Sequence, residues 1–331
     1  MTCKYYWIPI GLFVIAFNFH LKSNSQFGVD VERYSAIFEY GVSEWTPYYL
    51  KEFVSWGAFD LLAQFAGESS LSEKLLIIDC AMLVVLWIAC RKSKNAAWYR
   101  IFLFYPSFAF TLLSFNVLRQ YVSIFFLMGA CIASVERRVA GVVVFSVMAI
   151  AAHNGAVLAV LPLVLFQFKD ARPILKMLAF LVGLGVLVSV FASDLLIRLM
   201  SSGESTLEEP GWKVALYAVL SFYLVAILAK KHDWLNRYQN ELDHSVVLLA
   251  WYFFLGGGLL SLLPMENWMI SRNWLTIISI QSFMILCIGR GIQQEFFSRV
   301  IPIVAFAVPM WALTFLHPGA REMAFGGWIG K

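Results

Sequence analysis

Long apolar runs follow one another along the whole chain, and short polar or basic segments separate them. A helix needs about 20 mostly apolar residues to cross a bilayer, and these runs approach that length. Inside lipid, backbone polar groups must bond to one another, which favours helices. The pattern therefore predicts an all-α, polytopic helical membrane protein with about 11 spans. The predicted spans cover residues 5–19, 75–90, 98–114, 121–134, 139–166 as two short helices, 177–199, 213–229, 246–263, 273–289 and 300–316.

The segment 21–74 interrupts this pattern early in the chain. It is polar, aromatic and rich in acidic residues, so we expect a long loop on one side of the membrane. Within it, residues 53–66 are apolar but too few to cross a bilayer, and they carry Asp60 and Gln64, which indicates an interfacial or re-entrant helix. The first apolar run lacks a small-residue cleavage site, which favours an anchor over a signal peptide. We interpret residues 1–331 as a single integral membrane domain.

The apolar run at residues 139–166 decides the predicted topology. As one helix it would place the basic residues after it on the opposite side from those before it. Split at His153-Asn154-Gly155, it places every basic cluster on one side, as the positive-inside rule favours. The clusters are Arg91/Lys92/Lys94, Arg137/Arg138, Lys169/Arg172/Lys176, Lys230/Lys231/Arg237 and Arg290/Arg299. With the amino terminus inside, the 21–74 segment and the histidine break lie at the outer face.

Composition narrows the class of protein further. The 331 residues are 60% hydrophobic and 14% charged, whereas soluble domains carry about 25% charged residues. The net charge of +4 fits cytoplasmic loops, and we expect no nucleic acid partner. The five cysteines form neither a metal-binding spacing nor a disulfide framework. Walker, Rossmann, zinc and serine-hydrolase motifs are absent from the sequence, so an outer-face reaction requires a donor already activated in the membrane, and a lipid-linked diphosphate fits.

The stretch Phe115–Gln120 places a fixed charge between two apolar runs. If the second run is a helix, Asn116 is a suitable N-cap and Arg119 falls in the first turn. The helix macrodipole disfavours a cation there, but free N–H groups and a guanidinium fork suit a phosphate. The alternative is an arginine that reaches to lipid headgroups.

Ser271 and Arg272 repeat this arrangement late in the chain, as the cap and the first turn of a further predicted helix. Two guanidiniums at two helix amino termini on one face predict a diphosphate clamp formed by Arg119 and Arg272. Asn116 and Gln120 flank Arg119 and belong to this predicted diphosphate-binding set. Structural arginines at helix ends remain the alternative.

Three further side chains on the predicted outer face are candidates for catalysis. His153 is either an acid–base group or a hydrogen-bonded core residue that packs the break. Asp30 is either catalytic or a loop acid that caps an amphipathic helix over residues 31–40. Glu52 precedes the short apolar helix and is either catalytic or its cap. The two acids could hold a divalent ion, but their spacing does not require one, so we predict no metal site and no cofactor.

Several short motifs occur together over about residues 25–280. They are Gly28-Val29-Asp30-Val31-Glu32-Arg33-Tyr34 in the first outer loop, Glu52 before the short apolar helix, Asn116-Val117-Leu118-Arg119-Gln120, His153-Asn154-Gly155, and Ser271-Arg272-Asn273. With these motifs the chain resembles the EpsG family of exopolysaccharide-synthesis membrane proteins, which is similar to Wzy-type polymerases of O-antigen and capsule. The Asn-x-x-Arg-Gln element is the most specific of them.

The resemblance implies a multi-spanning glycosyltransferase similar to the GT-C architecture, with a long first outer loop. The implied reaction is polysaccharide polymerisation, in which a growing glycan moves from polyprenyl diphosphate to a lipid-linked repeat unit on the outer face of the bacterial inner membrane. Arg119 and Arg272 would stabilise the leaving diphosphate, and His153 or Asp30 would take the acceptor proton. The implied partners are the lipid-linked donor and acceptor, membrane lipid and, optionally, a chain-length regulator.

Two other functions stay open at this point. An O-antigen ligase uses a similar donor with a lipid A core acceptor, but ligases usually have a large outer loop late in the chain, where these loops are short. A transporter or flippase for a lipid-linked glycan would line a path with arginines and perform no chemistry. Transporters often carry internal repeats, and none is evident in this sequence.

Overall fold

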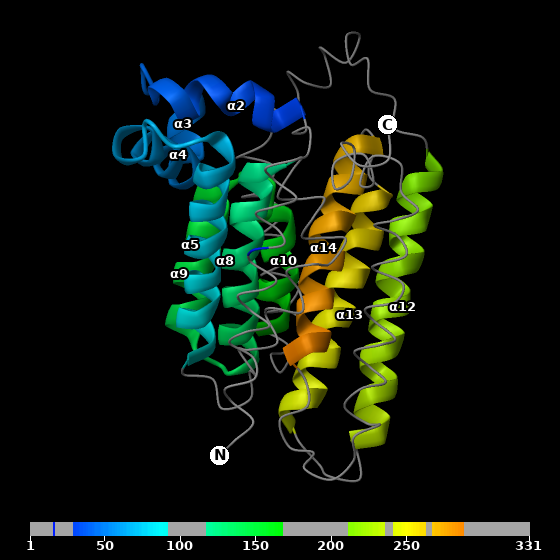
Figure 1. The fold of residues 1–331 in the computed structure, drawn as a ribbon. Helices are drawn as coiled ribbons and strands as arrows, with labels where there is room; N and C mark the ends of the chain where they lie inside the picture. The colour runs from blue at the N-terminus through cyan, green and yellow to red at the C-terminus, as the bar shows by residue number, and fades with distance from the viewer. Residues whose placement is uncertain are drawn as a thin grey trace.

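The computed structural model describes residues 29–91, 117–167, 211–235, 241–262 and 267–287, together with residue 16. Every regular element in these ranges is an α-helix, in agreement with the predicted all-α class. Figure 1 shows long helices side by side, with shorter helices across one end. In chain order the helices are α2 (Val29–Tyr40), α3 (Pro47–Lys51), α4 (Phe53–Phe65), α5 (Leu71–Arg91), α8 (Leu118–Val135), α9 (Val139–Ala152), α10 (Ala156–Gln167), α12 (Gly211–Leu235), α13 (Glu241–Ser261) and α14 (Asn267–Cys287).

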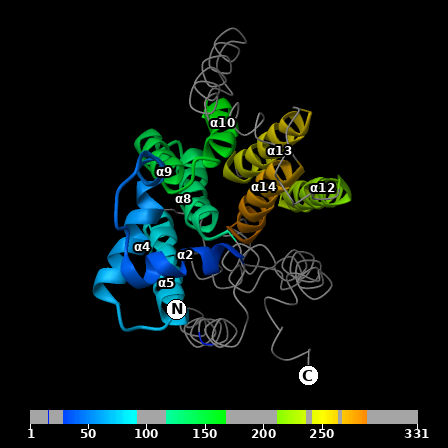
Figure 2. The ribbon, with the colours of Figure 1, turned by 90° about the horizontal axis from the view of Figure 1, so that it is seen from above.

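Helix α8 lies at the centre of the bundle. Seen from above, α5 and α9 pack on one side of it, and α10 and α14 lie on the other (Figure 2). Because it has neighbours on several sides, 89% of its residues are buried, compared with 33% for the apolar part of α12 at the edge. The first residues of α8 are therefore held in place by several other helices.

The apolar run at residues 139–166 forms two helices, as predicted. Helix α9 ends at Ala152 and α10 begins at Ala156. At the far end of α10, Gln167 donates a hydrogen bond from Nε2 to Oγ of Ser134, which lies near the end of α8. Helix α10 therefore runs in the same direction as α8. Helix α9, which lies between them in the sequence, runs in the opposite direction. The break between α9 and α10 consequently lies at the end of the bundle where α8 begins.

Helices α2, α3 and α4 lie across that same end of the bundle (Figure 1). Helix α4 corresponds to the short apolar helix predicted at residues 53–66, and it contacts both α2 and α9. Proline at the first position of α3 favours a helix start, since its fixed φ suits that position. Helix α2 begins at Val29 rather than at residue 31, so Asp30 lies inside its first turn. Asp30 therefore does not precede this helix as a loop acid that caps it, which was the alternative to a catalytic role.

Two polar side chains fix the helices at this end to one another. Nζ of the buried Lys74, at the start of α5, donates to the carbonyl of Phe38 at 2.7 Å. Oδ1 of Asp60, on α4, accepts the backbone N–H of Val42 at 2.7 Å. Between α2 and this contact, Gly41 has a φ of 77°, and a Cβ there would lie 2.6 Å from Oδ1 of Asp60. The turn after α2 therefore requires glycine, and α4 is attached on the side away from α9 as well.

Helix α14 begins at Asn267 rather than at the predicted residue 273. The added turn buries Ile270 in the core, which gives the helix a reason to start early. Ser271 consequently lies inside the helix and does not cap it. Arg272 lies beyond the first turn, so its predicted position at the helix amino terminus is corrected as well.

Helix α13 approaches its neighbours closely at two glycines. A Cβ at Gly256 would lie 2.9 Å from Cγ of Pro162 on α10, and a Cβ at Gly257 would lie 2.6 Å from Cδ1 of Ile277 on α14. Small residues allow helices to pack this closely within lipid.

Two described helices are long and apolar enough to cross a membrane, namely α8 over Leu118–Val135 and the Gly211–Ala229 part of α12. Shorter apolar helices cover Val139–Ala152, Ala156–Gln167 and Ser245–Ser261. This composition is consistent with a helical membrane protein. Apart from residue 16, the predicted spans at residues 5–19, 98–114, 177–199 and 300–316 lie outside the described residues.

Candidate functional site

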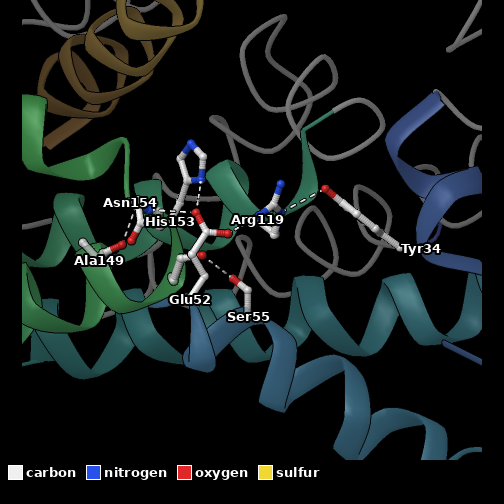
Figure 3. Close-up of polar contacts among 9 residues, drawn as sticks. Tyr34, Glu52, Ser55, Arg119, Ala149, His153 and Asn154 are labelled. Carbon is white, nitrogen blue, oxygen red and sulfur yellow. Dashed lines mark hydrogen bonds and ion pairs between the residues drawn. The ribbon is translucent and has the colours of Figure 1, made fainter. Parts of the chain in front are cut away.

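Glu52 lies where two helices at the end of the bundle meet. Helix α3 ends at Lys51 and α4 begins at Phe53, so Glu52 is the C-cap of one and the N-cap of the other, with φ −125° and ψ 43°. Its side chain caps neither helix. It points instead to the break between α9 and α10, and the side chain is only 5% exposed (Figure 3). A carboxylate placed so deeply requires partners.

Both oxygens of the Glu52 carboxylate have partners from distant parts of the chain. Oε1 accepts the backbone N–H of Asn154 at 2.9 Å and lies 2.9 Å from Nδ1 of His153. Oε2 accepts a hydrogen bond from Nη1 of Arg119. An ionised carboxylate only accepts, so Nδ1 of His153 carries the hydrogen. The other ring nitrogen, Nε2, points away from Glu52 (Figure 3), and it is the ring atom left to exchange a proton with a substrate.

The surroundings of Glu52 keep it ionised. Burial on its own would raise the pKa of Glu52. The hydrogen bond and the charge of His153, together with the charge of Arg119, outweigh burial and lower the pKa from 4.5 to about 2. The N–H of Asn154 acts in the same direction. Glu52 is therefore a permanent anion at neutral pH and holds His153 in one orientation, as the carboxylate does in other histidine–carboxylate pairs.

Arg119 is fixed by aromatic side chains as well as by Glu52. Its Nε donates to the hydroxyl of Tyr34, on α2, at 2.9 Å. The guanidinium carbon lies 4.8 Å from the centre of the Trp56 ring and 5.5 Å from that of Tyr34, distances at which cation–π attraction operates. The two rings meet edge to face at 5.1 Å. With 17% of its side chain exposed, Arg119 is held in a set orientation and still reaches the surface.

The histidine break is held against α4 by a second contact. Oγ of the buried Ser55 donates to the carbonyl of Ala152, the last residue of α9, at 2.8 Å. His153 has extended backbone, with φ −156°, and 23% of its side chain is exposed. A Cβ at Gly155 would lie 2.9 Å from Nε2 of His153. Glycine at that position therefore leaves room for the imidazole where it lies.

Gln120 connects the start of α8 to α14. Its Nε2 donates to the carbonyl of Arg272 at 2.7 Å and to Oγ1 of Thr276 at 2.6 Å. The side chain of Gln120 is buried, so here it joins two helices, and its predicted contact with diphosphate stays a prediction. Gln120 directly follows Arg119, so this hydrogen bond places the backbone of Arg272, on α14, beside the first turn of α8.

For the remaining predicted site residues, Asp30 and Asn116, the structure describes the backbone position of the first only. Asp30 lies in the first turn of α2, one turn before Tyr34. Asn116 lies outside the described residues. The N-cap of α8 is Val117, with φ −138° and no side-chain cap, which corrects the prediction that Asn116 occupies that position. Helix α8 begins at Leu118 because the backbone of Val117, with ψ 61°, is not helical, and Arg119 falls in the first turn as predicted.

Sequence reasoning missed three participants. Tyr34, Trp56 and Ser55 hold Arg119 and the histidine break, and none was a candidate from sequence. The available signal was that Tyr34 ends the Gly28–Tyr34 motif and that the other two follow Glu52 directly on α4. Within the described ranges, no group of three or more His, Cys, Asp and Glu side chains is placed to hold a metal ion, so no metal centre is assigned.

These observations first define a class, an all-helical bundle consistent with a membrane protein, in which an ionised carboxylate, a histidine and an arginine meet at one end. The model of the EpsG family matches residues 5–320, and the chain belongs to that family. The resemblance indicated by the sequence motifs is thereby confirmed. The family is associated with exopolysaccharide synthesis and with polymerases of the glycosyltransferase kind. Comparisons with curated proteins and with solved structures gave no match.

Proposed function

We propose that this protein is a Wzy-like polysaccharide polymerase. It transfers a growing glycan from polyprenyl diphosphate to a lipid-linked repeat unit at the outer face of the bacterial inner membrane. The observation that carries the proposal is the buried carboxylate of Glu52, which bonds to both His153 and Arg119. Membership of the EpsG family supports the substrate class.

His153 serves as the proton acceptor of the reaction. Glu52 holds the Nδ1 hydrogen, so the lone pair of a neutral imidazole lies on Nε2. That atom lies on the side of the ring away from Glu52 (Figure 3), where an acceptor hydroxyl would approach. Among the two candidate bases from sequence, His153 is favoured because its ring is oriented by a buried anion.

Arg119 and Arg272 bind the diphosphate leaving group and stabilise its negative charge. Arg119 lies in the first turn of α8, where helix N–H groups and a guanidinium together favour phosphate. Arg272 is half-buried on α14 at the same end of the bundle, and Gln120 bonds to its carbonyl. Charge develops on the diphosphate as the glycosidic bond breaks, and fixed cations stabilise it.

The transfer itself balances with these groups. The hydroxyl oxygen of the acceptor sugar attacks the anomeric carbon of the donor glycan and forms the new C–O bond. The bond between that carbon and the diphosphate oxygen breaks, and its electron pair leaves with polyprenyl diphosphate. The hydroxyl proton passes to Nε2 of His153. No nucleotide-sugar donor takes part.

Reconstitution tests the proposed function. Purified full-length protein in detergent is mixed with lipid-linked repeat units, and glycan length is followed on gels. We expect a ladder of lengthened glycans. Transfer only to a lipid A core acceptor would identify a ligase. Movement of the lipid-linked glycan across vesicle membranes, with no new bond, would identify a transporter.

Replacing His153 tests the proton acceptor. We expect His153→Ala to lower polymerisation by about 10²–10⁴-fold, the usual contribution of a general base, with unchanged protein in the membrane. Asp30→Asn is assayed in parallel. If His153→Ala keeps full glycan ladders and Asp30→Asn loses them, Asp30 is the base. Full ladders in His153→Ala would mean that His153 only packs the break between α9 and α10.

Labelling tests the orientation in the membrane. In a cysteine-free background, we expect Ser25→Cys and Asn267→Cys both to react with an impermeant thiol reagent in intact spheroplasts. The reason is that all basic clusters fall on the other side in the predicted topology. Reaction of only one site would contradict a common outer face.

A further inference from the structure

One anion is shared between the two halves of the candidate site. Oε2 of Glu52 bonds to Arg119, and Oε1 bonds to His153 and to the N–H of Asn154. The negative charge is delocalised over both oxygens, so a change at one oxygen alters the attraction felt at the other. The carboxylate therefore joins the residue proposed to bind the donor with the residue proposed to take the acceptor proton.

Few other charges act on His153 in the described part of the chain. Helices α9 and α10, on either side of it, contain no Asp, Glu, Lys or Arg. The ionisable groups bonded to His153 or to its partners are Glu52, Arg119 and, behind Arg119, Tyr34. A further cation, Arg272, lies on α14 at the same end of the bundle. Since Glu52 is only 5% exposed, solvent screens this set weakly. Among the described contacts, Glu52 is therefore the group that joins His153 to Arg119.

We propose that Glu52 is a positioning residue that makes His153 a stronger proton acceptor once the donor diphosphate is bound. This inference rests on the proposed function of Arg119. A diphosphate bound at Arg119 takes up part of the guanidinium charge, and Arg119 then compensates Glu52 less. The carboxylate charge acts more on the imidazole and stabilises its protonated form. Proton transfer from the acceptor hydroxyl to Nε2 is thereby favoured when the leaving group is in place.

The coupling must act in both directions. If bound diphosphate favours protonated His153, then protonated His153 favours bound diphosphate by the same factor. Binding of a diphosphate probe should therefore tighten as pH falls, and Glu52 should be required for most of that change. The direct attraction between His153 and the probe does not depend on Glu52, so the two contributions are separable.

The test uses farnesyl diphosphate, which carries no sugar and cannot react. Its dissociation constant from the purified full-length protein in detergent is measured by calorimetry from about pH 8 to about pH 5. The same series is measured with His153→Asn. Its pH dependence comes from protonation of the probe itself and is subtracted from that of the wild type. We expect the His153-dependent gain in affinity on acidification to be roughly fivefold or more, and most of it to be lost in Glu52→Gln.

Two variants keep the result interpretable. Glu52→Asp retains the charge but is too short to reach Arg119 and His153 together, so it should also lose the gain, and it replaces Glu52→Gln if that variant does not fold. Asp60→Asn removes another carboxylate of α4, one that bonds to Val42, and should behave as wild type.

Two outcomes overturn the proposal. The same gain in Glu52→Gln as in wild type would show that the probe acts on His153 directly. Absence of probe binding to the wild-type protein would remove the donor site from Arg119, while the reconstitution assay still decides separately whether the protein polymerises glycans.

Discussion

Arg119 and Arg272 are equivalent in the sequence, where each follows a capping residue at the start of an apolar run, but the structure places them differently. Arg119 lies in the first turn of α8 and bonds to Glu52 and Tyr34. Arg272 lies inside α14, beyond its first turn, and Gln120 and Thr276 both donate hydrogen bonds to its backbone carbonyl. Arg119 thus lies at the amino terminus of its helix, where Glu52 and Tyr34 hold its side chain, whereas Arg272 lies further inside its helix.

The difference shows what the segment at the end of the bundle contributes. Helices α2 and α4 reach the start of α8 with an aromatic pair and a carboxylate, which fix the plane of the Arg119 guanidinium. A fixed cation stabilises a transition state better than one that must reorganise. The field of the helix dipole is strongest in the first turn, where Arg119 lies and Arg272 does not. We therefore expect the two arginines to differ in the size of their effects, and the following predictions test that difference.

The largest expected effect is that of arginine-to-lysine substitution. Arg119→Lys should lower polymerisation by about 10²–10³-fold, because an ammonium cannot bond to Tyr34, Glu52 and a phosphate from one plane. Arg272→Lys should also shorten glycan ladders, but less. Ladder length is compared at matched protein levels. Full ladders in both variants would make these residues membrane anchors, since lysine reaches headgroups equally well.

A smaller effect is expected on stability at low pH. Because the pKa of Glu52 is lowered from 4.5 to about 2, its ionised form stabilises the folded chain above pH 4.5, and this contribution of about 3 kcal/mol is lost as pH falls toward 2. The unfolding temperature in detergent should therefore fall over this window more in wild type than in Glu52→Gln. Arg272→Lys serves as a control and should keep the wild-type pH dependence. Parallel curves for wild type and Glu52→Gln would contradict the ion pair.

The smallest expected effect on polymerisation is that of alanine at Gly155, compared with alanine at Gly258 in the other part of the bundle. Gly155→Ala should displace the His153 ring, since the new Cβ would lie 2.9 Å from Nε2, and we expect a roughly tenfold loss of polymerisation. Gly258→Ala, on α13, is the matched control because a Cβ there meets nothing within 4 Å. Equal activity of the two variants would mean that the position of the ring is not critical.

Much of the fold was predictable because it depends on local pattern. The division of residues 139–166 into two helices followed from the polar break and the distribution of basic clusters, and α4 followed from the length of its apolar run. The start of α14 was not predictable in the same way, because the burial of Ile270 depends on neighbouring helices. Polar residues that look like a cap can lie inside a helix when the residues before them are buried.

The candidate site was predictable residue by residue but not as an arrangement. Glu52, Arg119 and His153 were all candidates, since polar groups in an apolar chain are few. That Glu52 joins the other two could not be read from sequence, because its partners lie 67 and 101 residues further along. The roles of Tyr34 and Trp56 depend on the same long-range packing.

Those separations also bear on how the protein is made. Glu52 is synthesised well before Arg119, and His153 is synthesised last of the three, so the partners of the carboxylate are complete only when α8, α9 and the following turn have been made. Contacts between distant residues form late and slow folding. A nascent chain that ends before His153 should therefore present an accessible segment at residues 47–65, open to proteolysis, while a chain that continues past Gly155 closes it. The contacts of Glu52 thus form only after the helices that carry its partners have been made.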